Sequence, residues 1–201
     1  MKTANWQRYL EEQARVHDKR LFALTELAHV ASTSRRELSV ELARLVKARV
    51  VERYGYGLYG LPGQSSPEYV LPWLDPHAYM TGAFALLQHG LITQAPAGIT
   101  CFTDRRHDRS STETPAGRYD FVRVSRSVYR PPEQGVIAGP EQALCDYVYL
   151  MRQRGVAPES QVTFRHLNRL RRGILRSLAP RYPATVRKHI AALLASPRDR
   201  R

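Results

Sequence analysis

Residues 32–63 read STSRRELSVELARLVKARVVERYGYGLYGLPG, and this stretch decides the fold that the sequence predicts. Its first half places Leu38, Leu42 and Leu45 at the spacing of the buried stripe of an amphipathic helix. Ser34 stands three residues before Glu37, as the two partners of a capping box do. We therefore expect a helix that begins at Ser34, or at the neighbouring Thr33, and buries its leucines.

The second half of the stretch, VVERYGYGLYGLP, alternates aliphatic and aromatic residues around Gly55, Tyr56 and Gly57. This pattern predicts two short strands joined by a turn whose glycines permit positive φ. We expect Tyr54 and Tyr59 to pack inside this hairpin and Tyr56 to lie at its tip.

Two helices are predicted before this stretch. NWQRYLEEQARVH, residues 5–17, would bury Trp6, and FALTELAHVA, residues 22–31, has Thr25 as its cap. Three helices followed by a hairpin predict a winged helix-turn-helix domain over residues 1–63, within a protein of the α+β class.

The helix that begins at Ser34 is the expected recognition helix, because a helix-turn-helix inserts its second helix into the major groove and this one has a basic outer face. Arginine suits guanine O6 and N7 or phosphate, hydroxyls add short hydrogen bonds, and valine can touch a thymine methyl. Arg36 is favoured for base contacts. The alternative is that these cations form an ordinary solvated face. The predicted DNA-binding residues are Thr33, Ser34, Arg35, Arg36, Ser39, Val40, Arg44, Lys47, Arg53 and Tyr56.

The proline-rich segment 64–76 has the composition of a linker, so a second domain is expected over residues 77–201. Alternation and apolar spacing predict its elements. Helices are expected over residues 78–92, 140–154, 164–180 and 183–196, and strands over residues 98–103, 118–127 and 134–139, with a polar loop over 104–117. Helices and strands mixed in this order predict an α/β domain.

The net charge of +13 favours a polyanionic partner, but the charge is unevenly distributed. Residues 1–62 have a net charge of +4, residues 63–151 of −2 and residues 152–201 of +11. The C-terminal helices therefore predict a second basic surface for DNA, RNA or a protein, unless the arginines are merely solvated. Its expected members are Arg165, Arg169, Arg171, Arg172 and Arg176.

Two segments of the second domain resemble the C-terminal region of AbiEi-family antitoxins. YMTGAFALLQHGLI, residues 79–92, is similar to the family's aromatic-[ISM]-[ST]-x-x-[SA]-A-L-x-x-[HW]-G-L pattern, and AGPEQALCDYVY, residues 138–149, to its Pro-Glu-Lys-[AT]-Leu-x-Asp pattern. The head ending RVVERYGYGLYGLPG is also similar to the family's N-terminal winged helix. The resemblance departs at Gln142, where lysine is common, and at Arg49, where many winged helices use glycine in the left-handed conformation at the helix end.

This resemblance implies a transcriptional repressor that is the antitoxin of a bacterial type IV toxin-antitoxin system acting in abortive infection. Its implied partners are double-stranded DNA, at repeats in its own promoter, and a nucleotidyltransferase-like toxin encoded nearby. In a type IV system the antitoxin counters the toxin without a requirement for direct contact.

An enzymatic alternative is a nuclease tethered to DNA by the winged helix, with Asp104, Asp108, Glu113 and Asp120 as its carboxylates. The sequence lacks an acidic pair followed by lysine, a phosphate-binding glycine loop and a nucleophile elbow, so we expect no enzyme activity and no cofactor. His107, with Asp104 and Asp108, is interleaved with arginines that repel a cation, so we expect no metal site.

Cys101 and Cys145 show no zinc-ligand spacing and are expected as reduced core residues. No run of about 18 apolar residues is present, which predicts a soluble, cytoplasmic protein without a membrane partner.

Overall fold

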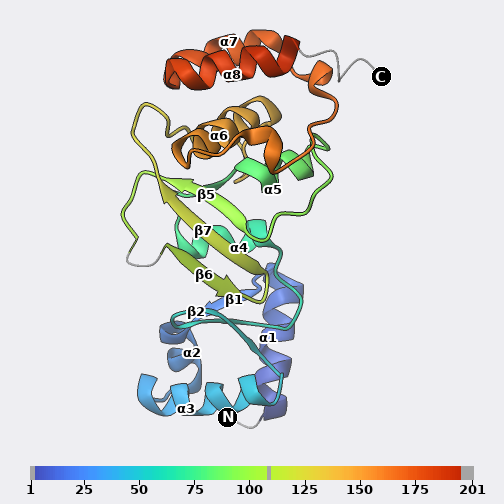
Figure 1. Ribbon diagram of the computed structural model, residues 1–201. Coiled ribbons are helices and arrows are strands. Elements are labelled where there is room, and N and C mark those ends of the chain that lie inside the picture. The colour runs from blue at the N-terminus through green and yellow to red at the C-terminus, as the bar shows by residue number, and fades with distance from the viewer. Residues whose placement is uncertain (1–2, 108–109, 196–201) are drawn as a thin grey trace. The chain divides into compact units, whose positions relative to one another are not determined.

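The computed structural model describes residues 3–107 and 110–195 and has the α+β fold expected from the sequence, with two small sheets (Figure 1). The described chain divides into two compact units. The first contains the residues up to Leu74 together with Thr112–Arg118, and the second contains the remaining described residues. None of the described helices is long and apolar enough to cross a membrane.

The first unit combines four helices with a three-stranded sheet. Its elements are α1 (Thr3–His17), β1 (Leu21–Ala23), α2 (Leu24–Ala31), α3 (Arg35–Lys47), β2 (Glu52–Gly55), β3 (Leu58–Gly60) and α4 (Pro67–Leu74). The strands are antiparallel in the order β1-β3-β2, and Tyr59 of β3 is opposite Phe22 of β1 and Arg53 of β2. Leu38, Leu42 and Leu45 are buried as the periodicity predicts.

Two details of this unit were wrong in the sequence prediction. Thr25 is not a cap, because α2 follows Ala23 directly and has no side-chain cap hydrogen bond. The amide of Leu24 instead donates to the carbonyl of Gly57 in the β2–β3 turn, at 2.7 Å. The strand β1 was not predicted, because three residues are too few to show an alternating pattern. Both features depend on contacts between segments that are distant in sequence.

The segment 64–76 was predicted as a linker but contains the helix α4. Pro67 opens this helix, where proline fits because the first amides have no partner within a helix. Val70 and Leu71 are completely buried, and the hydroxyl of Tyr69 donates to the carbonyl of Asp18 at 3.1 Å. Burial of these apolar residues stabilises a helix in a segment whose composition is typical of a linker.

The remaining elements follow α4 along the chain. They are β4 (Tyr79–Met80), α5 (Gly82–Gln88), β5 (Ile99–Thr103), β6 (Ser111–Thr114), β7 (Gly117–Arg123), α6 (Pro140–Gln153), α7 (Arg172–Leu178) and α8 (Ala184–Ala195). The strand order is β4-β5-β7-β6, with β4 antiparallel and β7 parallel to β5. Three 3-10 helices, Pro158–Ser160, Leu167–Arg169 and Ala179–Arg181, connect the last helices.

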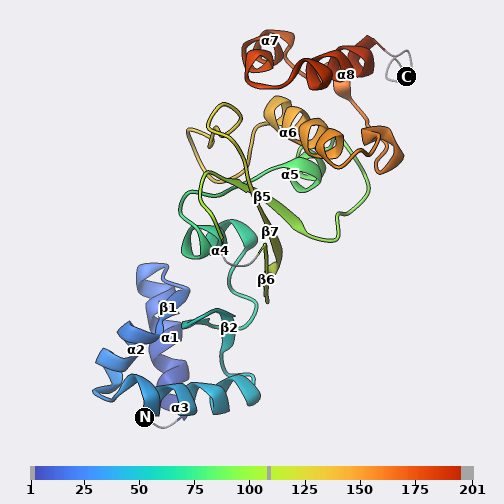
Figure 2. The ribbon, with the colours of Figure 1, turned by 60° about the vertical axis from the view of Figure 1, so that its left-hand side comes forward.

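Helix α6 is the centre of the second unit, since every residue from Glu141 to Met151 is buried. In Figure 2, α7 and α8 form a layer over α6, and α5 lies beside α6. The expected stripe of Ala143, Leu144, Tyr147, Val148 and Met151 lies in this core. The core thus encloses residues 141–151 of α6.

Four predicted elements of this region differ in the structure. The helix predicted over 78–92 begins only at Gly82, because Tyr79 and Met80 pair with β5. Residues 134–139 are not a strand and have only the bridge between Ile137 and Met80. The polar loop contains β6, and the helix predicted over 164–180 is divided into a 3-10 turn and α7. Short polar or arginine-rich segments have too little apolar periodicity to reveal these boundaries.

Candidate nucleic-acid interface

The start of α3 is held by a complete capping box. The backbone amide of Glu37 donates to Ser34 Oγ at 3.3 Å, and the Ser34 amide donates to Glu37 Oε2 at 3.2 Å. Thr33 and Ser34 also donate their hydroxyl hydrogens to this carboxylate, at 2.9 and 2.8 Å. Hydrogen bonds from Ser34 and Thr33 lower the pKa of Glu37, which keeps the cap ionised. The helix therefore begins at a fixed residue.

The cap leaves the first two residues of α3 pointing into solvent. Arg35 and Arg36 are both exposed, and neither forms an ion pair with another residue of the described chain. Val40, one turn further along, is 54% exposed although it is apolar. This face can offer two free guanidinium groups and one methyl-bearing side chain to a ligand.

The β2–β3 turn lies beside this end of α3. Tyr56 is 100% exposed at the turn, whereas Tyr54 and Tyr59 are buried in the hairpin, as predicted. A groove of about 480 Å³ is lined by Arg35, Arg36 and Ser39 of α3, by Tyr56 and Gly57 of the turn, and by Ala23, Leu24 and Thr25 at the start of α2. Three separate segments thus converge on one concave surface.

A second groove of about 330 Å³ continues along α3. It is lined by Ser39, Ala43 and Val46 of the helix and by Arg53, Tyr56, Gly57, Tyr59 and Leu24. Arg53 is oriented by its own strand, since its Nε donates to the carbonyl of Gly55 at 3.1 Å. The exposed residues Arg44 and Lys47 complete the basic part of α3, and neither of these two lines the described grooves.

The structure assigns different roles to the hydroxyl residues among the predicted contacts. Thr33 and Ser34 serve the capping box, and Ser39 Oγ donates to the carbonyl of Arg35 at 2.7 Å. Their hydroxyl hydrogens are therefore engaged within the helix. Each oxygen still has lone pairs that can accept a hydrogen bond. The sequence did not indicate this internal use of Ser39.

The end of α3 has the left-handed residue that the sequence suggested. Arg49 has φ of 56°, and Val50 N donates to the carbonyl of Leu45 at 3.0 Å. A non-glycine residue in this conformation costs about 1 kcal/mol relative to glycine. The close turn after Arg49 is what returns the chain from α3 to β2.

The second basic surface is exposed in the structure. All five predicted arginines are solvent-exposed, but they have different surroundings. Arg171 is attached to the buried carboxylate of Glu141, which accepts from Arg171 N at 2.8 Å and lies 3.5 Å from Arg171 Nε. The other members, Arg165, Arg169, Arg172 and Arg176, form no ion pair within the described chain.

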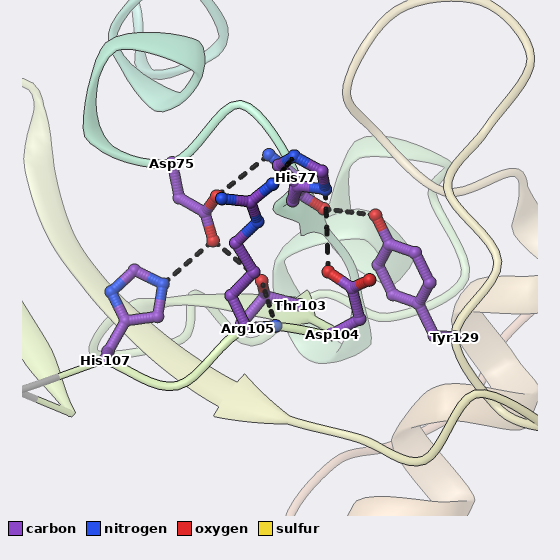
Figure 3. Close-up of polar contacts among 7 residues, drawn as sticks. All are labelled: Asp75, His77, Thr103, Asp104, Arg105, His107 and Tyr129. Atoms are coloured by element: carbon purple, nitrogen blue, oxygen red, sulfur yellow. Dashed lines mark hydrogen bonds and ion pairs between the residues drawn. The ribbon is translucent and has the colours of Figure 1, made fainter.

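A polar cluster joins residues 75–77 to the end of β5 (Figure 3). The buried carboxylate of Asp75 accepts hydrogen bonds from Thr103 Oγ1 at 2.7 Å, His107 Nε2 at 2.8 Å and the His77 amide at 2.8 Å. Burial alone raises the pKa of Asp75, but the hydrogen bonds from Thr103 and His107 outweigh it and lower the pKa. The His107 ring stacks on Phe121 with 4.2 Å between ring centroids.

The carboxylates of the nuclease alternative are arranged as follows. Asp104 faces His77, with 3.5 Å between Oδ1 and Nδ1, and Arg105 Nη2 lies 2.5 Å from His77 Nε2. Glu113 of β6 lies 3.9 Å from Arg118, Asp120 is part of β7, and Asp108 lies outside the described residues. Within the described residues, no three His, Cys, Asp or Glu side chains group as metal ligands.

A buried network that the sequence did not predict connects residues 79–81 with α6 and Tyr182. Asp146 Oδ2 accepts from Thr81 Oγ1 at 2.8 Å and from Tyr79 Oη at 3.2 Å, and Oδ1 accepts from Tyr182 Oη at 2.6 Å. His89 Nε2 lies 2.8 Å from the carbonyl of Ala138. Burial raises the pKa of Asp146 to about 6 although these hydroxyls oppose the shift.

Cys101 and Cys145 are free and buried, as predicted. Burial raises the pKa of both thiols, to about 12 for Cys145, so neither is a thiolate at neutral pH. The pattern residues Tyr79, Thr81 and Asp146 are likewise enclosed in the core. These three residues of the second unit therefore serve its packing.

No protein-family model matches this chain, and no curated protein is significantly similar to it.

Proposed function

We propose that the chain is a DNA-binding transcriptional repressor whose first unit is a winged helix-turn-helix. The order α1-β1-α2-α3-β2-β3 supports this assignment, with α3 as the recognition helix and the β2–β3 hairpin as the wing. The observation that carries the proposal is the groove shared by Arg35, Arg36 and Tyr56, since it joins the start of the helix to the tip of the wing. The predicted contact residues are those named from the sequence.

The chemistry of this groove fits duplex DNA. Two unpaired guanidinium groups can bind guanine O6 and N7 bidentately or hold phosphates, and Val40 can touch a thymine methyl. The phenol of Tyr56 can donate to a phosphate or enter the minor groove. The capping box supports specificity, because it holds Arg35 and Arg36 on a helix end that does not need to fold on binding.

We further propose that this repressor is the cytoplasmic antitoxin of a type IV system that autoregulates its operon. The resemblance of residues 79–92 and 138–149 to AbiEi antitoxins carries this part. The network around Asp146 supports it, because the two segments are hydrogen-bonded to each other and so form one structural unit. A nucleotidyltransferase-like toxin encoded nearby is the proposed functional partner.

The decisive experiment measures binding of the purified protein to the DNA upstream of its own gene, beside a scrambled duplex. We compare the wild type with an Arg35→Ala/Arg36→Ala variant at about 50 and about 200 mM salt. Loss of two base or phosphate contacts should weaken operator binding by about tenfold to a hundredfold and reduce the salt slope by about 1 to 2.

The matched control is Arg8→Ala/Arg15→Ala, which removes the same charge from exposed positions of α1. This control should retain operator binding within about twofold, because long-range charge effects are screened at these salt concentrations. A wild-type protein that does not prefer its own upstream DNA over the scrambled duplex would refute the repressor proposal. An equal loss in both variants would refute the assignment of the groove.

A further inference from the structure

The C-terminal helices carry a charge imbalance that the DNA-binding proposal does not use. Residues 152–195 contain nine arginines and one lysine but a single carboxylate, Glu159. That carboxylate is already engaged, since Glu159 Oε1 lies 2.9 Å from His189 Nε2. Unscreened like charges within about 10 Å repel one another and destabilise a compact fold.

Four of these cations are concentrated between the 3-10 turn and α7. Arg165 and Arg169 lie before and within the turn, and Arg172 and Arg176 are one helical turn apart on α7, so they share a face. All four are exposed and form no ion pair within the described chain. With His166, they form what we call the C-terminal arginine surface.

His166 is an unusual member of this surface. It has φ of 57°, a left-handed conformation that a residue with a β-carbon rarely adopts, and its side chain is exposed. No hydrogen bond or ion pair of its side chain is seen within the described chain. An exposed imidazole held in a strained conformation between two arginines is therefore not explained by packing.

The backbone around His166 is held at both ends. Arg165 N donates to the carbonyl of Leu91 at 2.8 Å, and Arg171 N donates to the buried Glu141 carboxylate at 2.8 Å. Between these anchors, Arg169 N donates to the carbonyl of His166 at 2.9 Å. Strained residues persist when surrounding contacts determine the conformation in this way, and such residues concentrate at functional sites.

We infer that the C-terminal arginine surface binds the phosphodiester backbone of single-stranded nucleic acid, with His166 as a platform for an unpaired base. Arginine rather than lysine fits this ligand, because the planar guanidinium binds phosphate bidentately. Histidine and other ring side chains stack on bases that are not paired, and a fixed platform reduces the entropy lost on binding. A duplex hides these base faces.

The test uses the full chain and fluorescence anisotropy with labelled RNA, single-stranded DNA and duplex DNA of one unrelated sequence. The variant Arg165→Gln/Arg169→Gln/Arg172→Gln/Arg176→Gln should bind single strands at least about tenfold more weakly. Its salt slope should fall by about 2 to 3, since each phosphate contact to a single strand contributes about 0.7. A melting curve verifies that the variant remains folded.

The matched control removes four exposed arginines elsewhere, as Arg8→Gln/Arg15→Gln/Arg123→Gln/Arg126→Gln. It has the same change in net charge and should retain single-strand binding within about twofold. An equal loss in this control would show that net charge alone is responsible and would overturn the inference.

Variants of His166 distinguish the contribution of the imidazole ring to binding from the effect of the strained backbone on stability. His166→Gly should raise the melting temperature, because glycine accepts positive φ without cost, and yet should weaken single-strand binding by about fivefold to tenfold. His166→Asn, which also tolerates this conformation, should weaken binding similarly. Unchanged affinity in both variants would overturn the role of the ring.

A comparison of the labelled RNA, single-stranded DNA and duplex DNA shows which kind of nucleic acid the C-terminal arginine surface binds. Similar affinity for single-stranded RNA and DNA supports binding through backbone and base faces, and tighter binding of RNA adds a role for the 2′-hydroxyl. Preference of this surface for duplex DNA, or complete displacement of RNA by polyglutamate at equal charge concentration, would overturn the inference. The latter outcome would instead indicate an acidic protein partner.

The Arg35→Ala/Arg36→Ala variant distinguishes this inference from the repressor proposal. It should lose operator binding but retain single-strand binding, and the C-terminal variant should show the opposite pattern. Failure of operator recognition in the wild type would leave the single-strand result fully interpretable, because the two surfaces share no residues.

Discussion

Asp75 and Asp146 are carboxylates of the same unit, both almost fully buried, whose pKa values are shifted in opposite directions. Asp75 is 4% exposed and Asp146 is 0% exposed. Burial raises the pKa of both, but at Asp75 the hydrogen bonds from Thr103 and His107 reverse the shift, and at Asp146 the hydroxyls of Tyr182, Thr81 and Tyr79 only reduce it. At Asp75 the hydrogen bonds from Thr103, His107 and the His77 amide together outweigh burial, whereas at Asp146 burial remains the dominant cause.

This comparison separates two uses of a buried acid. Asp75 is stabilised as a carboxylate and connects the end of β5 to residues 75–77, with His107 as a further partner (Figure 3). In the described hydrogen bonds of Asp146, every donor is a neutral hydroxyl. These bonds connect β4, α6 and the turn that follows α7. A carboxylate such as Asp146 stabilises the packing of the unit, and its environment exists only when all of these elements are folded together.

The largest effect is expected for Asp146→Ala. The substitution removes the acceptor for the hydroxyls of Tyr79, Thr81 and Tyr182 and leaves a cavity, so it should reduce the free energy of unfolding of the second unit by about 4 kcal/mol. Hydrogen exchange of the α6 amides measures this unit separately. Asp104→Ala, which removes a partly exposed carboxylate, is the control and should cost less than about 1 kcal/mol. An equal loss of unfolding free energy in Asp146→Ala and Asp104→Ala would contradict the special role of the buried Asp146 network.

The pH dependence of stability should be the next largest effect. Because the pKa of Asp146 rises from 3.8 to about 6 on folding, its stabilising contribution is fully present below about pH 4 and is lost as the pH rises through about 6. The loss should amount to about 3 kcal/mol and should disappear in Asp146→Asn. Asp75 has a lowered pKa and so acts in the opposite sense, with stability lost as the pH falls below its ordinary range.

The same exchange experiment, carried out from about pH 3 to about pH 7, compares the two acids directly. The pH-dependent difference between wild type and Asp146→Asn should lie between pH 4 and pH 6. The stability advantage of wild type over Asp75→Asn should instead shrink as the pH is lowered towards and below 3.8, because protonation removes the contribution of the carboxylate. A slope of the same sign in both variants would contradict the opposite shifts.

The smallest effect is expected for Asp75→Asn at neutral pH. The amide retains one acceptor but places a donor either against Thr103 and His107, which share Oδ2, or against the His77 amide at Oδ1, so about 2 kcal/mol should be lost. The loss should be local, as faster exchange near Thr103 and Arg105 with little change in α6. His107→Ala, which leaves the Asp75 hydrogen bond from Thr103 intact, should cost less. Global destabilisation by Asp75→Asn would show that this cluster also supports the core.

Much of the first unit was predictable because its features repeat within single segments. The leucine spacing of α3, the pairing of Ser34 with Glu37 and the Gly-Tyr-Gly turn are all visible over a few residues, and the structure confirms them. The candidate groove was predictable only as a set of residues. That Arg35, Arg36 and Tyr56 line one concavity depends on the contact between α2 and the β2–β3 turn.

The second unit was less predictable for a related reason. Its helix α6 could be predicted from its apolar stripe, but residues 79–80 and 111–114 become strands only because neighbouring strands supply their hydrogen-bond partners. Likewise, the proline-rich segment 67–74 becomes a helix because Val70 and Leu71 are buried. Composition describes a segment in isolation and contains no information about such partners.

By itself, the sequence determined the α+β class, the amphipathic helices, the hairpin and the accumulation of positive charge after residue 152. Those properties follow from periodicity and composition, which reside in neighbouring residues. Only the tertiary structure decided that Tyr79, Thr81 and Tyr182 meet at Asp146, that His107 meets Asp75, and that His166 is held in a strained turn between arginines. Such contacts join residues up to 67 positions apart, and they exist only when the packing of several elements brings them together.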